Sequence, residues 1–185
     1  MQGSPSAHGN EWEDLRNYLL SNLIWDPARD GRTLKNEWLD LHYGPAAPPM
    51  RRWIDRLHDR AIASGMHCRC LGGSFSDYGL DESDARAGLA AIEEALRLAG
   101  NDKAVRNRVD KASIWAYRAA IEPIWHAKEG EKIDPALARR MRPLAKRFFE
   151  LCQKHGVTRT TDIARHTIGK YEKRLRGILG SWDQP

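Results

Sequence analysis

The spacing of apolar residues constrains this chain more than any other feature. Along almost every long segment of the 185 residues they recur every three or four positions, which is the period of an α-helix with one buried face. No long segment follows the strict alternation that is typical of a half-buried strand. The sequence therefore predicts an all-α fold, a single helical bundle of about six to seven helices with one long irregular loop at about residues 66–80.

Six segments carry the helical pattern most clearly. We expect helices at about residues 10–25, 33–43, 48–64, 82–99, 102–125 and 134–156, and one or two short helices in the tail. Asn10 is the expected N-cap of the first helix, with Glu13 three residues on as in a capping box. In the second helix we expect Leu34, Trp38 and Leu41 to be buried.

Prolines and aspartates mark where several helices begin or bend. The prolines at 48–49 suit the first turn of the third helix, where a missing N–H group costs nothing. Asp81 and Asp134 are good N-caps for the fourth and sixth helices. Pro123 is expected to bend the fifth helix and Pro143 to kink the sixth, because proline removes a backbone hydrogen bond.

Charge is distributed unevenly along the chain. The formal net charge is +5, but residues 1–100 hold 11 Lys and Arg against 15 Asp and Glu, whereas residues 101–185 hold 19 against 10. A basic half suits a nucleic acid or an acidic protein surface, although solvated helix faces explain it more simply. Nucleic acid is therefore not the partner that we expect.

The segments predict three parts: an N-terminal linker at 1–10, a helical domain at 11–156, and short helices with a tail at 157–185. No apolar run approaches the roughly 20 residues that span a bilayer, and no charged start leads into an apolar core with a cleavage site. We expect no membrane partner, and the sequence does not indicate a compartment.

Cysteine and histidine provide the only clusters with metal-ligand or nucleophile chemistry. His67, Cys68 and Cys70 lie close together, but structural zinc needs four ligands, usually with two or more residues between cysteines. Cys152 has His155 three residues on, yet it lies beside an apolar stripe, where cysteine usually behaves as a small hydrophobe. We predict no metal or cofactor site, assign no catalytic residue, and do not expect the isolated chain to be an enzyme.

The tail offers an alternative function. Residues 160–179 contain a short apolar segment, a glycine and then a basic segment, an order that is similar to a helix-turn-helix of DNA-binding proteins. In that alternative Lys170, Lys173 and Arg174 contact nucleic acid. The glycine falls one position later than the usual spacing, and a pair of packed helices with a solvated basic face is the simpler interpretation.

Seven tryptophans raise the question of a carbohydrate platform, because aromatic faces stack on sugar rings. Trp12, Trp38 and Trp53 lie on apolar helix faces, which favours core packing. Trp25, at a helix end, and Trp182, in the tail, are not determined by the pattern.

Two stretches, LRNYLLSNLIWDPARD at 15–30 and YGPAAPPMRRWIDRLHD at 43–59, carry motifs in a recognisable order. The residues that form these motifs are Trp25, Asp26, Pro27, Tyr43, Gly44, Pro45, Ala46, Ala47, Pro48 and Met50. In this order the chain resembles the helical C-terminal region of bacterial glycoside-hydrolase-like proteins that carry a domain of unknown function and are distantly similar to α-glucuronidases. The resemblance is good over about 2–59 and extends, in helix pattern only, to about residue 156.

The resemblance implies that this chain is the back part of a longer protein whose sugar site lies in a barrel domain. The helical region is then a non-catalytic structural or assembly module. It packs on that barrel or on a second copy of itself, as a two-fold dimer, and lends a residue to the rim of a carbohydrate cleft. A basic nucleic-acid-binding protein that uses 160–179 and a small enzyme stay open as alternatives.

Overall fold

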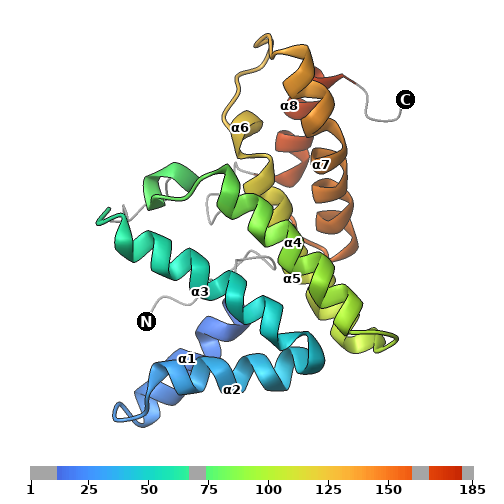
Figure 1. Ribbon diagram of the computed structural model, residues 1–185. Helices are drawn as coiled ribbons and strands as arrows, with labels where there is room; N and C mark the ends of the chain where they lie inside the picture. Colours follow the sequence, from blue (N-terminus) through green and yellow to red (C-terminus); the bar gives the residue numbers. More distant parts are fainter. Residues whose placement is uncertain (1–11, 67–73, 160–166, 181–185) are drawn as a thin grey trace. The chain divides into compact units, whose positions relative to one another are not determined.

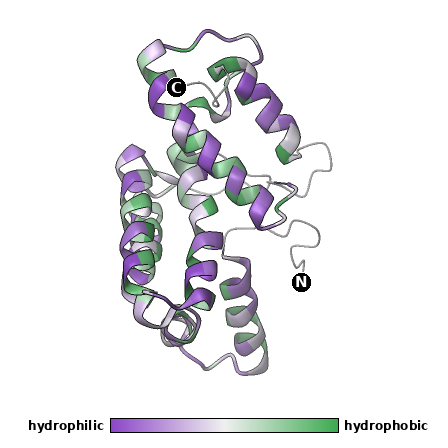
Figure 2. Cartoon of the chain, turned by 90° about the vertical axis from the view of Figure 1, so that its right-hand side faces the viewer, coloured by the Kyte–Doolittle hydropathy of each residue, from purple (hydrophilic) through white to green (hydrophobic). Residues whose placement is uncertain are grey.

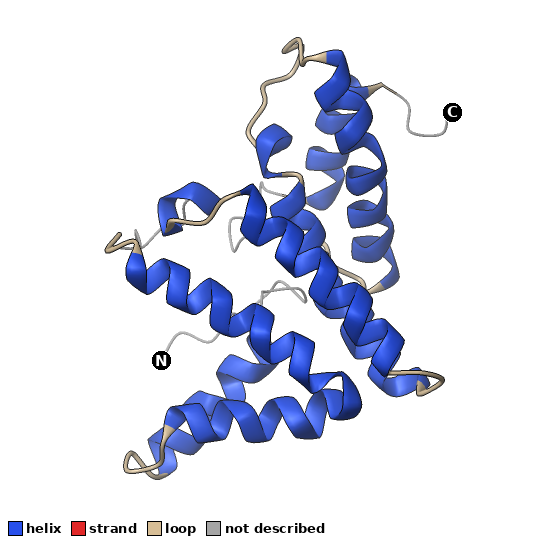
Figure 3. Ribbon diagram, viewed as in Figure 1, coloured by secondary structure: helices blue, strands red, loops and turns tan. Residues whose placement is uncertain are grey.

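The computed structural model describes residues 12–66, 74–159 and 167–180, and these residues form helices joined by turns, with no strand among them (Figure 3). The all-α prediction is confirmed. The α-helices are α1 (Glu13–Trp25), α2 (Gly31–Tyr43), α3 (Ala47–Ala63), α4 (Glu82–Leu98), α5 (Lys103–Ala120), α6 (Glu122–Trp125), α7 (Pro135–Lys154) and α8 (Ile168–Leu179) (Figure 1). Two 3-10 helices, η1 (Gly44–Ala46) and η2 (Phe75–Tyr78), lie between them, and η2 falls inside the loop predicted at 66–80.

The chain groups into two compact units that divide within α5, after Ser113. Among the described residues the first unit holds 12–66 and 74–113, and the second holds 114–159 and 167–180. The helices predicted as one bundle thus form two groups. The domain bounds expected from the sequence differ from these units and stay a prediction, since compactness alone does not show which part folds independently. Within the described ranges no helix is long and apolar enough to cross a bilayer.

Aspartate side chains start at least four of the described helices. At the start of α5, Asp102 accepts the backbone N–H groups of Ala104 and Val105, and three other helices begin in the same way. Asp30 caps α2, Asp81 caps α4 and Asp134 caps α7, and each accepts a backbone N–H from the first turn. The predicted caps of α4 and α7 are confirmed. The start of α1 differs, because Asn10 lies outside the described residues and the position before the helix is Trp12, with a φ of 55° and no side-chain cap.

The prolines of α3 lie in its first turn, as predicted, whereas Pro123 marks a new helix and not the predicted bend. The first turn of α3 contains Pro48 and Pro49, and the helix then buries Met50. Pro123 does more than bend a helix: α5 ends and the short α6 begins, with Pro123 in its first turn. Pro143 lies inside α7, which continues through it to Lys154.

The buried side of α2 is rotated from the one predicted. Leu34 and Trp38 are buried, but Leu41 is 73% exposed and Leu39 is fully buried in its place. At 100° per residue the inward side is centred between Trp38 and Leu39, and this turns Leu41 towards solvent. The apolar stripe expected from the sequence has the right period but the wrong centre.

Helices α3 and α4 pack antiparallel, as their ion pairs show. Arg52 lies beside Glu94 at 2.6 Å, and one turn after the other along α3 Arg56 reaches Asp84 at 2.7 Å and Arg60 reaches Asp81 at 2.7 Å. Figure 2 shows that the helices carry both hydrophilic and hydrophobic residues. Polar residues thus set the register between α3 and α4, while apolar residues fill the space between them.

Asp84 is the most deeply buried charged side chain among the described residues of the first unit. Its side chain has no exposed surface and accepts from Arg56 Nε at 2.7 Å, from Arg60 Nε at 3.3 Å and from the Asp81 N–H at 3.0 Å. A buried carboxylate left without partners costs about 3–5 kcal/mol. The two arginines therefore hold the start of α4 against α3.

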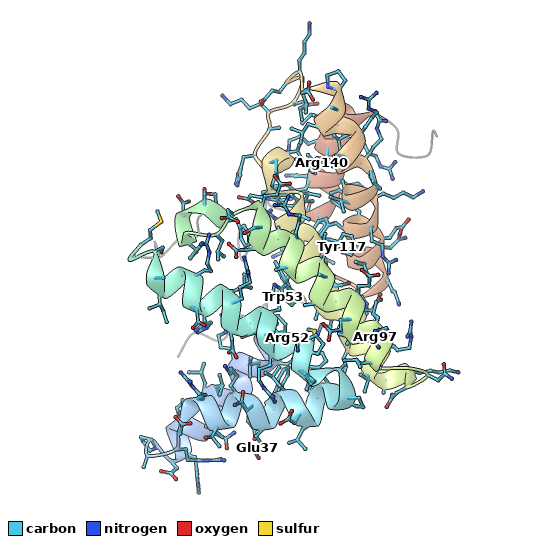
Figure 4. The ribbon with its side chains drawn as sticks, viewed as in Figure 1. Glu37, Arg52, Trp53, Arg97, Tyr117 and Arg140 are labelled. Atoms are coloured by element: carbon cyan, nitrogen blue, oxygen red, sulfur yellow. The ribbon has the colours of Figure 1, made fainter. Side chains whose placement is uncertain are left out.

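One turn along α4 from Asp84, a glycine allows the helices to approach closely. Trp53 lies on the side of α3 that faces α4 (Figure 4), and a Cβ atom at Gly88 would stand 2.8 Å from its Nε1. The Trp53 ring also meets Trp12 edge to face, with centroids 5.1 Å apart. The buried side of α4 is formed mainly by small residues, together with Asp84 and Ile92; the small residues are Ala85, Gly88, Ala91 and Ala95.

Helices α6, α7 and α8 and the end of α5 form the second unit. Trp125 of α6 stacks on Tyr171 of α8 with ring centroids 4.3 Å apart, and the Arg118 guanidinium lies over the Trp125 ring at 3.9 Å. Arg174 donates to the Trp125 carbonyl oxygen and lies 5.0 Å from the Tyr171 ring centre. This alternation of cations and rings joins α5, α6 and α8.

Replacing Gly88 by alanine should destabilise the first unit by about 1–3 kcal/mol, because the new methyl group overlaps the buried Trp53 ring. Gly31→Ala is the matched control, since a Cβ atom there meets nothing within 4 Å. Urea unfolding followed by circular dichroism measures both. Equal stability of the two variants would contradict the close α3–α4 packing.

Candidate functional site

The most prominent surface feature of the first unit is an exposed tryptophan at the end of α1. Trp25 is 91% exposed and its neighbour Ile24 is 61% exposed, and Trp25 is the most exposed large hydrophobic side chain among the described residues. We call Ile24, Trp25 and the turn at 26–30 the Trp25 corner. Tryptophan is among the residues most enriched at the centres of protein interfaces.

Hydrogen bonds hold the turn that follows Trp25. The Asp26 N–H donates to the Asn22 carbonyl oxygen at 2.9 Å. The Arg29 guanidinium donates to the Asn22 side-chain oxygen and reaches Glu37 of α2 at 3.4 Å. The corner is therefore tied to both helices, and the tryptophan projects from a fixed turn.

Helix α1 carries more apolar side chains than the first unit buries. Its apolar residues are Leu15, Tyr18, Leu19, Leu20, Leu23, Ile24 and Trp25. Only Leu15 is buried, and Leu19, Leu20 and Leu23 are partly exposed. A helix that is apolar on most sides is usually buried on most sides. Within the part of the chain that the structure describes, the apolar side chains at the Trp25 end of α1 are left exposed or half-covered.

Several of the remaining motif residues lie in the core or at the ends of helices. Tyr43 is 2% exposed and Met50 is fully buried, while Gly44 ends α2 with a φ of 49° that favours glycine. Pro27 and Pro45 are exposed. The motif thus combines core positions around the α2–α3 connection with exposed positions at the Trp25 corner.

The metal-ligand residues of the sequence, His67, Cys68 and Cys70, lie outside the described residues. Within 12–66, 74–159 and 167–180, no group of three or more His, Cys, Asp or Glu side chains is placed to hold a metal ion.

Cys152 is buried in the core of the second unit, among residues that include Phe148 and Leu151. Burial, with a smaller contribution from Glu172, raises the pKa of its thiol to about 12. A thiol of that pKa is protonated at neutral pH, so the arrangement disfavours a nucleophilic role with His155. Cys152 packs as a small hydrophobe.

The residues of the nucleic-acid alternative have different environments. Lys170 and Lys173 are exposed on α8. Arg174 is partly buried and donates to the Trp125 carbonyl oxygen, which engages the guanidinium inside the second unit. Residues 160–166, which would supply the first helix of a helix-turn-helix, lie outside the described residues.

The tryptophans on apolar faces contribute to the core, with Trp38 9% and Trp53 4% exposed and Trp12 partly buried. Trp182 lies outside the described residues. Of the two tryptophans that the sequence pattern left undetermined, Trp25 is therefore the described one, and its indole is exposed.

His42 is a residue that the sequence reasoning did not single out. Its ring stacks on Trp38, four residues earlier on α2, with centroids 4.1 Å apart, and Arg108 donates to its carbonyl oxygen at 2.9 Å. Burial, together with the positive charges of Arg108 and Lys111 and against the opposing effect of Asp14, lowers the pKa of the imidazole to about 4. The spacing of Trp and His by one helical turn was the available signal.

Residues 1–55 match a family model described as a domain of unknown function, DUF4838. The match covers the Trp25 corner, the α2–α3 connection and the start of α3. No curated protein and no solved structure matches the chain. The described residues within this match, 12–55, all belong to the first unit.

We predict that the stability of the first unit falls as pH is lowered from about 6.5 to about 4. The unfolded chain takes up a proton at His42 near pH 6.5, whereas the folded chain resists protonation until about pH 4. His42→Gln should show a smaller loss between pH 7 and pH 5 in urea unfolding. His58→Gln, at an exposed position of α3, is the control, and an unchanged loss in both variants would refute this role of His42.

Proposed function

We propose that this chain is a non-catalytic helical assembly module that anchors on another protein surface through the Trp25 corner. The single observation that carries the proposal is the 91% exposure of Trp25 on a hydrogen-bonded turn. An anchor held in place before binding avoids much of the entropy cost of ordering a loop at an interface. The incomplete cover of α1 supports the same surface.

A barrel domain of the glycoside-hydrolase-like kind is the partner that the sequence resemblance implies. The family-model match over residues 1–55 supports it, because the corner lies inside the matched segment. In this proposal the corner contributes contact area and orientation, and the chemistry of the sugar site belongs to the partner.

In the absence of a barrel domain, we expect the Trp25 corner to bind a second copy of the chain. An antiparallel contact of α1 with α1 of another copy would bring Glu13, at the acidic start of the helix, near Arg32 beyond the other end. The same contact covers the apolar side of α1 in both copies, as a two-fold interface requires. Charge and burial therefore favour the same arrangement.

We expect the chain to self-associate and Trp25→Ser to weaken the association by at least about tenfold, since loss of an interface anchor costs about 2 kcal/mol or more. The matched control is Leu41→Ser, which removes a side chain that is 73% exposed on α2. Light scattering over a range of concentrations measures the mass of all three proteins.

Both variants should keep the helical content and stability of the parent chain, because exposed side chains contribute little to folding. A strictly monomeric parent chain at high concentration would rule out self-association through the corner. Equal weakening by Trp25→Ser and Leu41→Ser would show that the corner is not the anchor.

A further inference from the structure

The charge of the second unit is concentrated on one helix. Six of the residues of α7 are basic and one, Glu150, is acidic. The basic residues are Arg139, Arg140, Arg142, Lys146, Arg147 and Lys154. At 100° per residue they fall on about half of the circumference of the helix. The other half is apolar and mostly buried. Arg139, Arg140 and Lys154 are exposed, and the other three basic residues of α7 are partly exposed.

Helix α8 runs antiparallel beside α7 and adds to this charge. The Ile168 N–H donates to the Thr158 carbonyl oxygen at 2.9 Å, next to the end of α7. Arg142 Nε donates to the Leu179 carbonyl oxygen at 2.8 Å, at the other end of α8. Lys170 and Lys173 are exposed on α8. We call the basic residues of α7, with Lys170 and Lys173, the α7–α8 basic face.

The residue types on this face favour one class of acidic partner over the others. Protein interfaces usually have an apolar or aromatic centre, but none of the large exposed hydrophobic side chains of the described residues comes from α7 or α8. Single-stranded nucleic acid is bound by aromatic stacking, and the aromatic ring of α8, Tyr171, already stacks on Trp125. The phosphates of a duplex require neither feature, because they are bound mainly by Lys and Arg.

The dimensions of the face also suit a duplex. Arg139 and Lys154 are separated by about 22 Å along the axis of α7, at 1.5 Å per residue. A DNA duplex carries one charge for about every 1.7 Å of its axis, so several phosphates lie within that length. Arginine donates to phosphate in a two-pronged geometry. Arg139 and Arg140 of α7 are exposed, whereas Arg142 donates to the Leu179 carbonyl oxygen and Arg147 pairs with Glu150 at 3.6 Å.

We propose that the α7–α8 basic face binds the phosphate backbone of duplex nucleic acid without reading its sequence. The sequence alone suggested that residues 160–179 would bind nucleic acid as a helix-turn-helix. In this proposal α7 supplies most of the phosphate contacts, and neither a helix-turn-helix nor Arg174 is needed. The surface is separate in sequence from the Trp25 corner and does not depend on it.

The test is fluorescence anisotropy of a short labelled DNA duplex of mixed sequence with the full chain. Binding should weaken by at least about tenfold as salt rises from about 50 to 200 mM, because neutralised phosphates release their counterions. A variant that joins Arg139→Gln, Arg140→Gln and Lys154→Gln should bind at least about tenfold more weakly. Its salt slope should be smaller by about one for each phosphate that the variant no longer neutralises.

The matched control joins Arg32→Gln, Arg86→Gln and Arg97→Gln, three exposed arginines of the first unit, and should bind within about twofold of the parent chain. Circular dichroism confirms that both variants keep their helices. Three outcomes overturn the proposal: no binding to the duplex at about 50 mM salt, equal weakening in the two variants, or tighter binding to polyglutamate or to phosphatidylserine vesicles than to the duplex.

Discussion

The buried carboxylate of Asp84 is the interaction on which the first unit depends most. It draws Arg56 and Arg60 of α3 to the start of α4, and Gly88, one turn further on, admits the Trp53 ring. The ion pairs fix the register and the glycine fixes the distance between the helices. Removal of the arginines would weaken the α3–α4 contact most, because a buried carboxylate without its partners costs about 3–5 kcal/mol, whereas a methyl group at Gly88 costs about 1–3 kcal/mol.

Several groups that could carry chemistry contribute instead to the packing of the folded chain. Cys152 fills the core of the second unit, His42 stacks on Trp38, and Arg174 is engaged with the Trp125 carbonyl oxygen. The features that remain on the surface are the Trp25 corner and the basic side of α7. Exposed apolar and strongly basic surfaces of this kind are typical of contacts with other molecules.

The positions of the helices could be predicted from the sequence, because the spacing of apolar residues and the capping residues are local properties of the chain. Asp81, Asp134 and the prolines of α3 began helices as expected. The rotation of α2 could not be predicted, because the choice between Leu39 and Leu41 depends on which neighbouring helices cover α2. The exposure of Trp25 depends in the same way on tertiary cover, so the motif identified the residue but not its role.

Hydroxyl-radical footprinting of Trp25 tests the central claim most directly, because it reports on the side chain that is proposed as the anchor. Met66, which is 49% exposed outside the corner, is the internal reference. Oxidation of Trp25 relative to Met66 should fall as the concentration of the chain rises, since association covers the indole. A constant ratio at all concentrations, in a sample that light scattering shows to associate, would contradict the corner as the anchoring surface.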